Sequence, residues 1–291
     1  MNSTQKRGCS KPRAALEVFT PSRYQQSVVF LCLFASPSLH AVMLAVQADR
    51  VVSLAEWEER WQQNRIGFHR PHVNKLLERN IKQVVNGRTG VRFFFPLCGK
   101  AVDMKWLADM GHSVVGVEIA EKAILQFYED NNMSYAVEPV PSIPGAKVYK
   151  NVEKSISIYH CDLYKFNSCV EGQFGAIWDR GSLVAINPED REKYASLLLS
   201  LMAEDCRYLL STLLYNPEQH KGPPFLVPNE QILALFGSSC DVQLLDSVDA
   251  LDQRWREAGL DFMTENTHLI APKIDKKGFN VFFIERYISP S

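Results

Sequence analysis

The sequence predicts an α/β protein built on a doubly wound, mostly parallel sheet with helices on both faces. From about residue 91 onwards, short apolar runs alternate with amphipathic segments, and most runs stop at a glycine, a proline or an acidic residue. This alternation is typical of parallel strands joined by crossover helices. The composition agrees, because 46% hydrophobic and 22% charged residues in a chain of 291 suffice for one full core and do not fit a fibrous or disordered protein.

Two helices are predicted before the first strand. The first begins at Ser53, because a serine followed three residues later by a glutamate is typical of a capping box. It places Trp57 and Trp61 one turn apart on one face. The second covers residues 72–85 and ends at an Asn-Gly pair, which favours the left-handed conformation that terminates helices.

The strands are predicted where apolar runs of suitable length end at turn-forming residues. In chain order they cover residues 91–95, 113–117, 155–160, 174–178, 207–214 and 242–245, with 262–269 and 279–284 as alternatives for the last strand. Amphipathic segments between them predict helices over residues 100–110, 121–131, 187–202, 229–236 and 252–258. The proline-rich stretch 139–144 is expected to be a loop.

The two ends of the chain differ in character from the middle. Residues 1–50 are predicted to form an N-terminal extension in which basic residues precede an apolar run over 28–46, as in targeting peptides. Pro37 and polar residues interrupt that run before it reaches the about 20 residues that span a membrane, so no stable membrane span is expected. An extension of a cytoplasmic enzyme is favoured, with an organellar presequence or a cleaved targeting peptide as alternatives. The globular domain is predicted over 51–273, and a C-terminal extension over 274–291.

Charge and metal-binding residues exclude several classes of partner. The formal net charge of −1 provides no global basic field, so sequence-independent nucleic-acid binding is not expected. The seven cysteines are scattered and include no C-x-x-C pair, which indicates reduced thiols rather than a disulfide frame or a zinc site. His69 and His72 form the closest histidine pair, but no carboxylate or cysteine stands near them, so no metal is expected.

The ligand of an open parallel sheet binds beyond the carboxyl ends of its strands. Glu118 ends the second strand, where nucleotide-binding folds place an acid that accepts hydrogen bonds from both hydroxyls of a ribose; the alternative is a carboxylate that caps the next helix. The loop over 96–100, after the first strand, has one glycine rather than the three that let a pyrophosphate approach a helix. A nucleoside cofactor without a pyrophosphate therefore fits best, which points to S-adenosylmethionine.

Other chemistries find little support in the sequence. It contains no P-loop, no G-x-S-x-G elbow and no H-E-x-x-H motif. Cys98 follows a strand and precedes a helix, as a nucleophile would, but no histidine partner is evident, so a packed or cofactor-lining thiol is favoured. Asp179, after the fourth strand, is expected to hold the adjoining loop, while its neighbour Arg180 faces the ligand side.

Long motifs in this chain closely resemble the thiopurine S-methyltransferase family. They lie at residues 94–108, 111–119, 177–188 and 222–225, and the resemblance extends in order over about residues 54–269. It implies a Rossmann-like class I methyltransferase fold with a mostly parallel, seven-stranded sheet. It also implies a cytoplasmic, usually monomeric enzyme that uses S-adenosylmethionine to methylate the sulfur of aromatic and heterocyclic thiols, including thiopurines.

The resemblance also assigns candidate site residues. Cofactor contacts fall on Trp57, Trp61, Phe68, Leu97, Glu118, Asp162, Leu163 and Arg180, with Phe68 also at the acceptor and Arg254 near it. The family commonly has serine or another small polar residue at the position of Asp162, although an acid there is ordinary in class I methyltransferases. From the residues alone, Trp57 and Trp61 either cover a sulfonium through their ring faces or form a hydrophobic staple.

The two arginines are the candidate catalytic groups. Because no general base is evident beside the methyl site, we expect Arg180 and Arg254 to favour the ionised acceptor, directly or through water. A surface ion pair for Arg180 and a solvated helix charge for Arg254 are the alternatives. Two other functions also stay open: a related methyltransferase for sulfide, selenium compounds or a halide, and a non-catalytic protein that binds S-adenosylmethionine.

Overall fold

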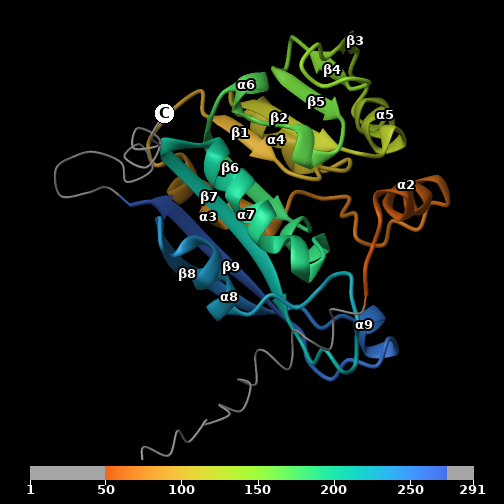
Figure 1. Ribbon diagram of the computed structural model, residues 1–291, viewed down its shortest axis with the longest axis vertical. Helices are drawn as coiled ribbons and strands as arrows, with labels where there is room; N and C mark the ends of the chain where they lie inside the picture. Colours follow the sequence, from red (N-terminus) through yellow and green to blue (C-terminus); the bar gives the residue numbers. More distant parts are fainter. Residues whose placement is uncertain (1–49, 274–291) are drawn as a thin grey trace, which may run out of the picture. The chain divides into compact units, whose positions relative to one another are not determined.

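A nine-stranded sheet organises residues 50–273, the part of the chain that the computed structural model describes (Figure 1). In chain order the strands are β1 (Arg92–Phe95), β2 (Ser113–Glu118), β3 (Ala136–Pro139), β4 (Lys147–Asn151), β5 (Ile156–His160), β6 (Phe174–Arg180), β7 (Met202–Leu214), β8 (Cys240–Asp249) and β9 (Thr264–Pro272). Their order across the sheet is β3-β4-β5-β2-β1-β6-β7-β9-β8. Neighbouring strands from β5 to β7 run parallel, whereas β9 is antiparallel to both β7 and β8.

Helices connect these strands in the predicted rhythm. They are α2 (Leu54–Gln62), α3 (Lys75–Val85), α4 (Val102–Asp109), α5 (Glu121–Asp130), α6 (Ser168–Glu171), α7 (Arg191–Leu201), α8 (Asn229–Phe236) and α9 (Gln253–Glu257). Single 3-10 turns lie at η1 (Leu163–Lys165), η2 (Leu183–Ala185) and η3 (Pro188–Asp190). The alternation of strand and helix is therefore confirmed, and only the four-residue α6 had no counterpart among the predicted helices.

Successive side chains of β1 enter opposite cores, as the pleat of a strand requires. Phe94 is buried with residues of α7 and α8. Phe93 and Phe95 are buried on the other face, with residues of α3, α4 and α5. Helices thus cover both faces of the sheet, which confirms the doubly wound arrangement.

The strand count differs from the expected seven, because β3 and β4 form a hairpin at the edge of the sheet, antiparallel to β5. The proline-rich stretch lies largely in the connection between them, and the flanking strands were missed. All four residues of β3 are exposed and Pro139 ends it, so the segment lacks the apolar alternation that indicates a strand. An edge strand tolerates proline, because its outer N–H groups need no partner in the ladder.

Several boundaries also differ from the prediction. β7 begins at Met202 rather than Arg207. Its first residues include exposed acidic side chains, which do not form an apolar run, and the pairing of β7 with β6 shifts register over this stretch. β8 is longer than the predicted 242–245, since half-exposed edge residues extend it. β9 agrees with the first alternative for the last strand, and residues 279–284 lie outside the described part.

Helix starts follow from the side chains that cap them. α3 begins later than the predicted residue 72, because the Asn74 side chain accepts hydrogen bonds from the N–H groups of Leu76 (2.8 Å) and Leu77 (3.4 Å). At α2 the predicted cap is present, since the Ser53 hydroxyl accepts from the N–H of Glu56 at 3.2 Å.

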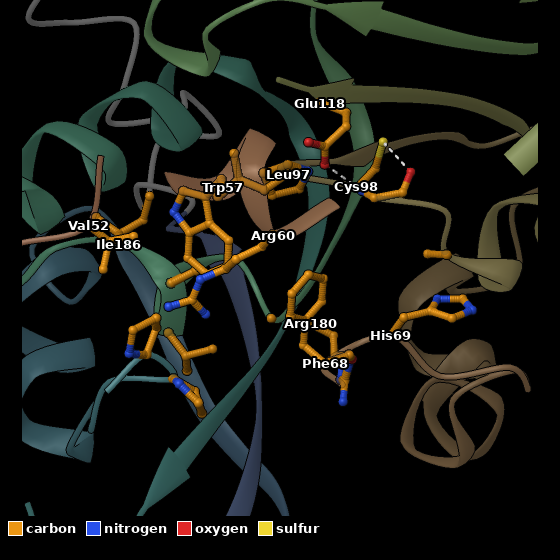
Figure 2. A pocket seen from close by; sticks show the side chains of 18 of the residues that line it. Val52, Trp57, Arg60, Phe68, His69, Leu97, Cys98, Glu118, Arg180 and Ile186 are labelled. Carbon is orange, nitrogen blue, oxygen red and sulfur yellow. Dashed lines mark hydrogen bonds between the residues drawn. The ribbon is translucent and has the colours of Figure 1, made fainter. Parts of the chain in front are cut away.

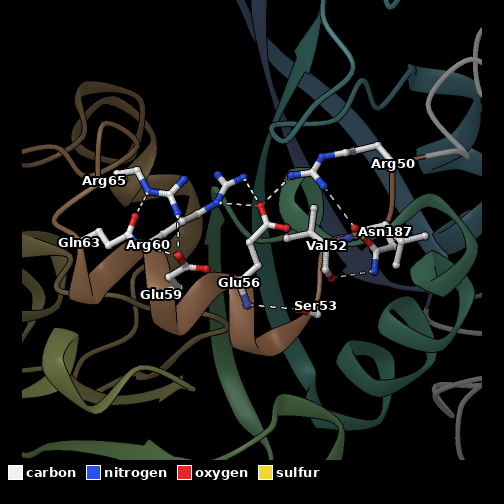
Figure 3. Close-up of polar contacts among 10 residues, drawn as sticks. Arg50, Val52, Ser53, Glu56, Glu59, Arg60, Gln63, Arg65 and Asn187 are labelled. Atoms are coloured by element: carbon white, nitrogen blue, oxygen red, sulfur yellow. Dashed lines mark hydrogen bonds and ion pairs between the residues drawn. The ribbon is translucent and has the colours of Figure 1, made fainter.

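Charged and amide side chains attach α2 to the rest of the protein (Figure 3). Oε1 of Glu56 accepts hydrogen bonds from both Arg50 and Arg60 at 2.7 Å, in place of the return bond of a full capping box. The N–H of Val52 donates to Oδ1 of Asn187 at 2.9 Å, and Nδ2 of Asn187 donates to the Val52 carbonyl at 3.2 Å. These contacts tie the start of α2 to the loop before η3, and so position the tryptophans of α2.

The predicted N-terminal and C-terminal extensions fall almost wholly outside the described residues, and the division at 51–273 stays a prediction. Among residues 50–273, no helix combines the length and the apolar character needed to cross a membrane. The cysteines of this part, at positions 98, 161, 169, 206 and 240, are all free thiols.

Candidate active site

A cavity of about 650 Å³ lies at the carboxyl ends of β1, β2 and β6, and α2 and α9 contribute to its wall (Figure 2). This is the position expected for the ligand of an open parallel sheet. All the candidate site residues line it: Trp57, Trp61, Phe68, Leu97, Glu118, Asp162, Leu163, Arg180 and Arg254. The tertiary structure therefore brings the whole predicted set together, and the contacts of these residues with a ligand stay predictions.

A tight turn after β1 fixes the carboxylate of Glu118. Leu97 and Gly99 both have positive φ angles, 46° and 52°, and the N–H of Gly99 donates to Oε2 of Glu118 at 2.8 Å. The N–H of Ala120, at the start of α5, donates to Oε1 at the same distance. Glu118 is thus not the cap residue of α5, which is Ala120, although its carboxylate accepts the N–H of that residue; it also lines the cavity, and its contact with a ribose stays a prediction. Burial raises its pKa, while the hydrogen bonds from Ala120 and Gly99 lower it.

The aromatic residues of α2 meet the loop that follows it. The ring of Phe68 lies edge-on to Trp57 and Trp61, with centroids 5.9 Å and 5.7 Å away. Trp61 is buried and packs against the first turn of α5, a contact with a second helix rather than the predicted hydrophobic staple within its own helix. Trp57 is half-buried, and the guanidinium of Arg60 lies 4.8 Å from its ring centroid (Figure 2). One aromatic face at the cavity therefore already attracts a cation.

The turn after β5 places Asp162 and Leu163 at the cavity wall. Oδ1 of Asp162 accepts a hydrogen bond from the N–H of Tyr164 at 3.0 Å, which caps the 3-10 turn η1. Leu163 is buried and gives this part of the cavity an apolar lining. Asp162 therefore combines a capping contact with a second oxygen that makes no hydrogen bond to another residue of the described part.

The two candidate catalytic arginines hold adjacent backbone carbonyls. Nη1 of Arg180 donates to the carbonyl oxygen of Phe68 at 2.7 Å, and Nη1 of Arg254 donates to that of Gly67 at 2.6 Å. Burial lowers the pKa of Arg180, and the negative charge of Glu265 opposes this shift. The alternative of a surface ion pair does not describe Arg180, which forms no ion pair within residues 50–273. The alternative of a solvated helix charge describes Arg254 only in part, because this side chain is exposed but bound to the loop.

Asp179 holds the loop next to Arg180, as predicted. It is fully buried, and its Oδ2 accepts hydrogen bonds from the hydroxyls of Tyr194 (2.6 Å) and Tyr208 (2.7 Å). Its Oδ1 accepts from the N–H of Leu183 at 3.1 Å, at the start of η2. Burial raises the pKa of Asp179, and the two tyrosine hydroxyls lower it.

The cavity is also lined by residues that were not among the candidates, including Asp103, Ser211 and Glu265. Asp103 stands in the first turn of α4, where an acid is ordinary and gives no separate signal. Its carboxylate accepts from the N–H of Asn74 at 2.7 Å and from Nε1 of Trp178 at 3.3 Å, and burial raises its pKa. Glu265 is an acid within a strand whose other residues are mostly buried, and an acid in such a position is the feature that could have indicated a site residue.

Cys98 is a buried thiol at the cavity, and burial raises its pKa, which supports the packed or lining role over a nucleophile. Within residues 50–273, no group of three or more histidine, cysteine, aspartate or glutamate side chains is arranged to hold a metal ion.

The sheet order and the cavity at its carboxyl edge define a Rossmann-like α/β protein with a ligand site at the end of its parallel strands. Among solved structures, the chain is similar to Burkholderia thailandensis 1,6-didemethyltoxoflavin-N1-methyltransferase, whose structure contains 1,6-didemethyltoxoflavin and S-adenosylhomocysteine. The TM-score is 0.52 at 13% identity, over 82% of this chain and 92% of that one. This likeness shows the fold, which is that of class I S-adenosylmethionine-dependent methyltransferases.

Sequence relatives identify the family. The family model described as thiopurine S-methyltransferase (TPMT) matches residues 52–273. A probable thiopurine S-methyltransferase of Danio rerio is 60% identical over 230 residues, which make up 79% of this chain and 99% of that protein. The thiopurine S-methyltransferase of Canis lupus familiaris is 48% identical over 78% of this chain and 93% of its own length. The chain belongs to the thiopurine S-methyltransferase family.

Proposed function

We propose that this protein transfers the methyl group of S-adenosylmethionine to the sulfur of aromatic and heterocyclic thiols such as thiopurines. The observation that carries the proposal is the gathering of all the candidate residues around one cavity at the carboxyl edge of the sheet. Family membership supports the same reaction, because the relatives in the family are named for it. The substrate would accordingly be a small thiol.

The side chains at the β1 and β2 ends fit the nucleoside part of this cofactor. Each oxygen of the Glu118 carboxylate accepts one backbone N–H and keeps a further acceptor site, so the group is able to receive both hydroxyls of a ribose. Asp162 would accept from the adenine amino group through the oxygen that η1 does not use. Leu97 and Leu163 would pack against the apolar faces, and Trp57 would cover the cation.

When bound, S-adenosylmethionine supplies an activated methyl group on a sulfonium sulfur. The protein then has to place an acceptor sulfur in line with that methyl group and stabilise its negative charge. Arg180 is suited to this task, because it lines the cavity and donates one N–H group to Phe68, while its other N–H groups make no hydrogen bond to another residue between 50 and 273. Arg254 would add a second positive charge on the same side, while its bond to Gly67 positions the loop.

Methyl transfer from labelled S-adenosylmethionine by the full-length chain tests the proposal. The acceptors are 6-mercaptopurine, thiophenol and inorganic sulfide, each measured against a reaction without acceptor. We expect turnover with the two aromatic thiols and little with sulfide. Turnover with sulfide alone would move the assignment to a small-anion methyltransferase, and cofactor binding without any turnover would leave only a binding function.

We further propose that the enzyme acts as a monomer in the cytoplasm, as the resemblance to the family implied. Light scattering of the purified full chain measures its mass in solution, and a mass of 33.1 kDa is expected. Fractionation of cells that express a C-terminally tagged chain measures its location. Recovery in an organelle, with a shortened N-terminus, would support the alternative of a presequence instead.

A further inference from the structure

A second charged group faces the cavity close to Arg180. In the register of the sheet, Arg180 at the end of β6 lies directly beside Ser211 of β7. On the other side of β7, Glu265 of β9 lies opposite Leu213, two residues along from Ser211 and therefore on the same face. Ser211, Glu265 and Arg180 all line the cavity. Three adjacent strands thus place a guanidinium, a hydroxyl and a carboxylate side by side.

The hydroxyl orients the carboxylate. Oγ of Ser211 donates to Oε1 of Glu265 at 2.5 Å, and Ser211 itself is buried. Oε2 of Glu265 makes no hydrogen bond to another residue in the range 50–273, and Arg180 and Glu265 are not within ion-pair distance in this part. Glu265 is nevertheless near enough for its charge to raise the pKa of Arg180. The cavity wall therefore presents an anchored carboxylate with one oxygen still able to accept.

The other carboxylate in this part of the cavity is less available. Asp103 already accepts from the N–H of Asn74 through Oδ1 and from the indole N–H of Trp178 through Oδ2. Each of its two oxygens thus already accepts one hydrogen bond, and it serves the packing of α3 against α4 and β6. Of the two acidic groups, Glu265 is the one with an oxygen that accepts no hydrogen bond from the described residues.

The chemistry of heterocyclic thiols matches this arrangement. In their thione form, such compounds carry an N–H on the ring atom next to the carbon that bears sulfur, whereas a carbocyclic aryl thiol has no donor there. A positively charged side chain beside a carboxylate that accepts hydrogen bonds is complementary to a ligand in which sulfur and N–H are adjacent. The protein's own groups are arranged in that pattern, with Arg180 for sulfur and Glu265 for the N–H.

We propose that Glu265, oriented by Ser211, accepts a hydrogen bond from the ring N–H of the neutral thione and so makes the enzyme selective for N-heterocyclic thiols over carbocyclic ones. As the acceptor sulfur gains its methyl group, the ring N–H bond breaks and the proton passes to the Glu265 carboxylate, while the former sulfonium leaves as the neutral thioether. This inference rests on the proposed S-methyltransferase function and names the substrate class of that site. Glu265 acts here as a specificity-determining residue, and Ser211 acts through it as a positioning residue.

The experiment compares two acceptors of nearly equal size, 2-mercaptopyridine and thiophenol, in the full-length wild type and in Glu265→Gln. The amide keeps the shape of the side chain and removes its charge, and Ser211 still has an oxygen to donate to. We expect kcat/KM for 2-mercaptopyridine to fall about tenfold or more, since a hydrogen bond to a charged group is lost. For thiophenol we expect a change of less than about twofold.

Two further variants sharpen the comparison. Ser211→Ala keeps the carboxylate of Glu265 but removes the hydrogen bond that orients it. We therefore expect kcat/KM for 2-mercaptopyridine to fall selectively again, but by less, about threefold. Glu129→Gln removes an exposed carboxylate on α5 and is the matched control, for which both acceptors should react as in the wild type. Binding of S-adenosylhomocysteine, measured by calorimetry, reports that each variant is folded; if Glu265→Gln is not, Ser211→Ala alone provides the test.

The outcomes separate this inference from the function on which it rests. Equal losses with both acceptors, or no loss with 2-mercaptopyridine, would overturn the role of Glu265 and leave the methyltransferase intact. A wild type that methylates neither acceptor would overturn the proposed function and this inference with it.

Discussion

Arg180 donates a hydrogen bond from Nη1 to the carbonyl oxygen of Phe68 at 2.7 Å, and so joins the end of β6 to the loop after α2. Arg254 makes the equivalent bond to the neighbouring carbonyl, that of Gly67, from α9. Gly67 leaves little room there, because an added Cβ would meet Nη1 of Arg254 at 3.0 Å. The arginines expected to act on the acceptor therefore also hold the loop that positions Phe68 against the tryptophans of α2.

This double role predicts how variants of Arg180 differ. Arg180→Ala should lower kcat/KM for an aromatic thiol by about a hundredfold, because both the charge at the sulfur and the hold on Phe68 are lost. The loss should be largest at pH values below the pKa of the free acceptor thiol, where the enzyme has to favour the thiolate. Arg180→Lys should recover part of the rate, since it keeps a positive charge. A pH–rate profile that moves in neither variant would exclude the electrostatic role and leave only the loop contact.

Glu118→Gln should weaken the binding of S-adenosylhomocysteine by about tenfold to a hundredfold. The amide has one acceptor oxygen, so it is unable to accept from Gly99, Ala120 and two ribose hydroxyls together. Titration calorimetry measures the affinity, and circular dichroism checks the fold of the variant. Glu129→Gln, on the exposed side of α5, is the matched control and should bind as the wild type does. Unchanged affinity in Glu118→Gln would remove the carboxylate from the cofactor site.

Tyr208→Phe should reduce the free energy of unfolding by about 1 to 3 kcal/mol, because the buried carboxylate of Asp179 loses one of its two hydroxyl donors. Urea denaturation at neutral pH measures this change. Tyr164→Phe is the matched control, since its buried hydroxyl has no hydrogen-bond partner in the described part of the chain and its removal should cost little. Equal effects of the two substitutions would mean that the hydroxyl of Tyr208 does not stabilise Asp179.

Stability should depend on pH through His268. This residue is buried in β9, and burial lowers its pKa from 6.5 to about 4. Between these values the unfolded chain binds a proton that the folded protein does not, so the free energy of unfolding falls as the pH falls from 6.5 towards 4. At about pH 5 the expected loss is about 2 kcal/mol relative to neutral pH.

Urea denaturation of the wild type and of His268→Gln, each at neutral pH and at about pH 5, checks this prediction. The variant has no titrating group at this position, so it should lose correspondingly less stability on acidification. A pH dependence of the same size in both proteins would assign the effect to other groups.

The regular elements and the main loops of the site follow from local sequence. The apolar runs that became β1, β2, β5 and β6 were predicted to within about two residues, and α8 was predicted in full at Asn229–Phe236. The edge hairpin was missed because its first strand is exposed, only four residues long and ends in a proline, and such a strand is defined by its partner rather than by its own pattern.

What the sequence by itself determined was the layered α/β fold and a set of candidate residues that all line the cavity, since strand and helix periodicity and the motifs of the strand-end loops are written in neighbouring positions. Only the tertiary structure decided which atoms meet. The Arg180–Phe68 bond joins residues 112 positions apart, and the Ser211–Glu265 bond joins residues 54 apart. Such pairs depend on strand register and on the docking of a loop, which are set by the packing of the whole domain and leave no local pattern.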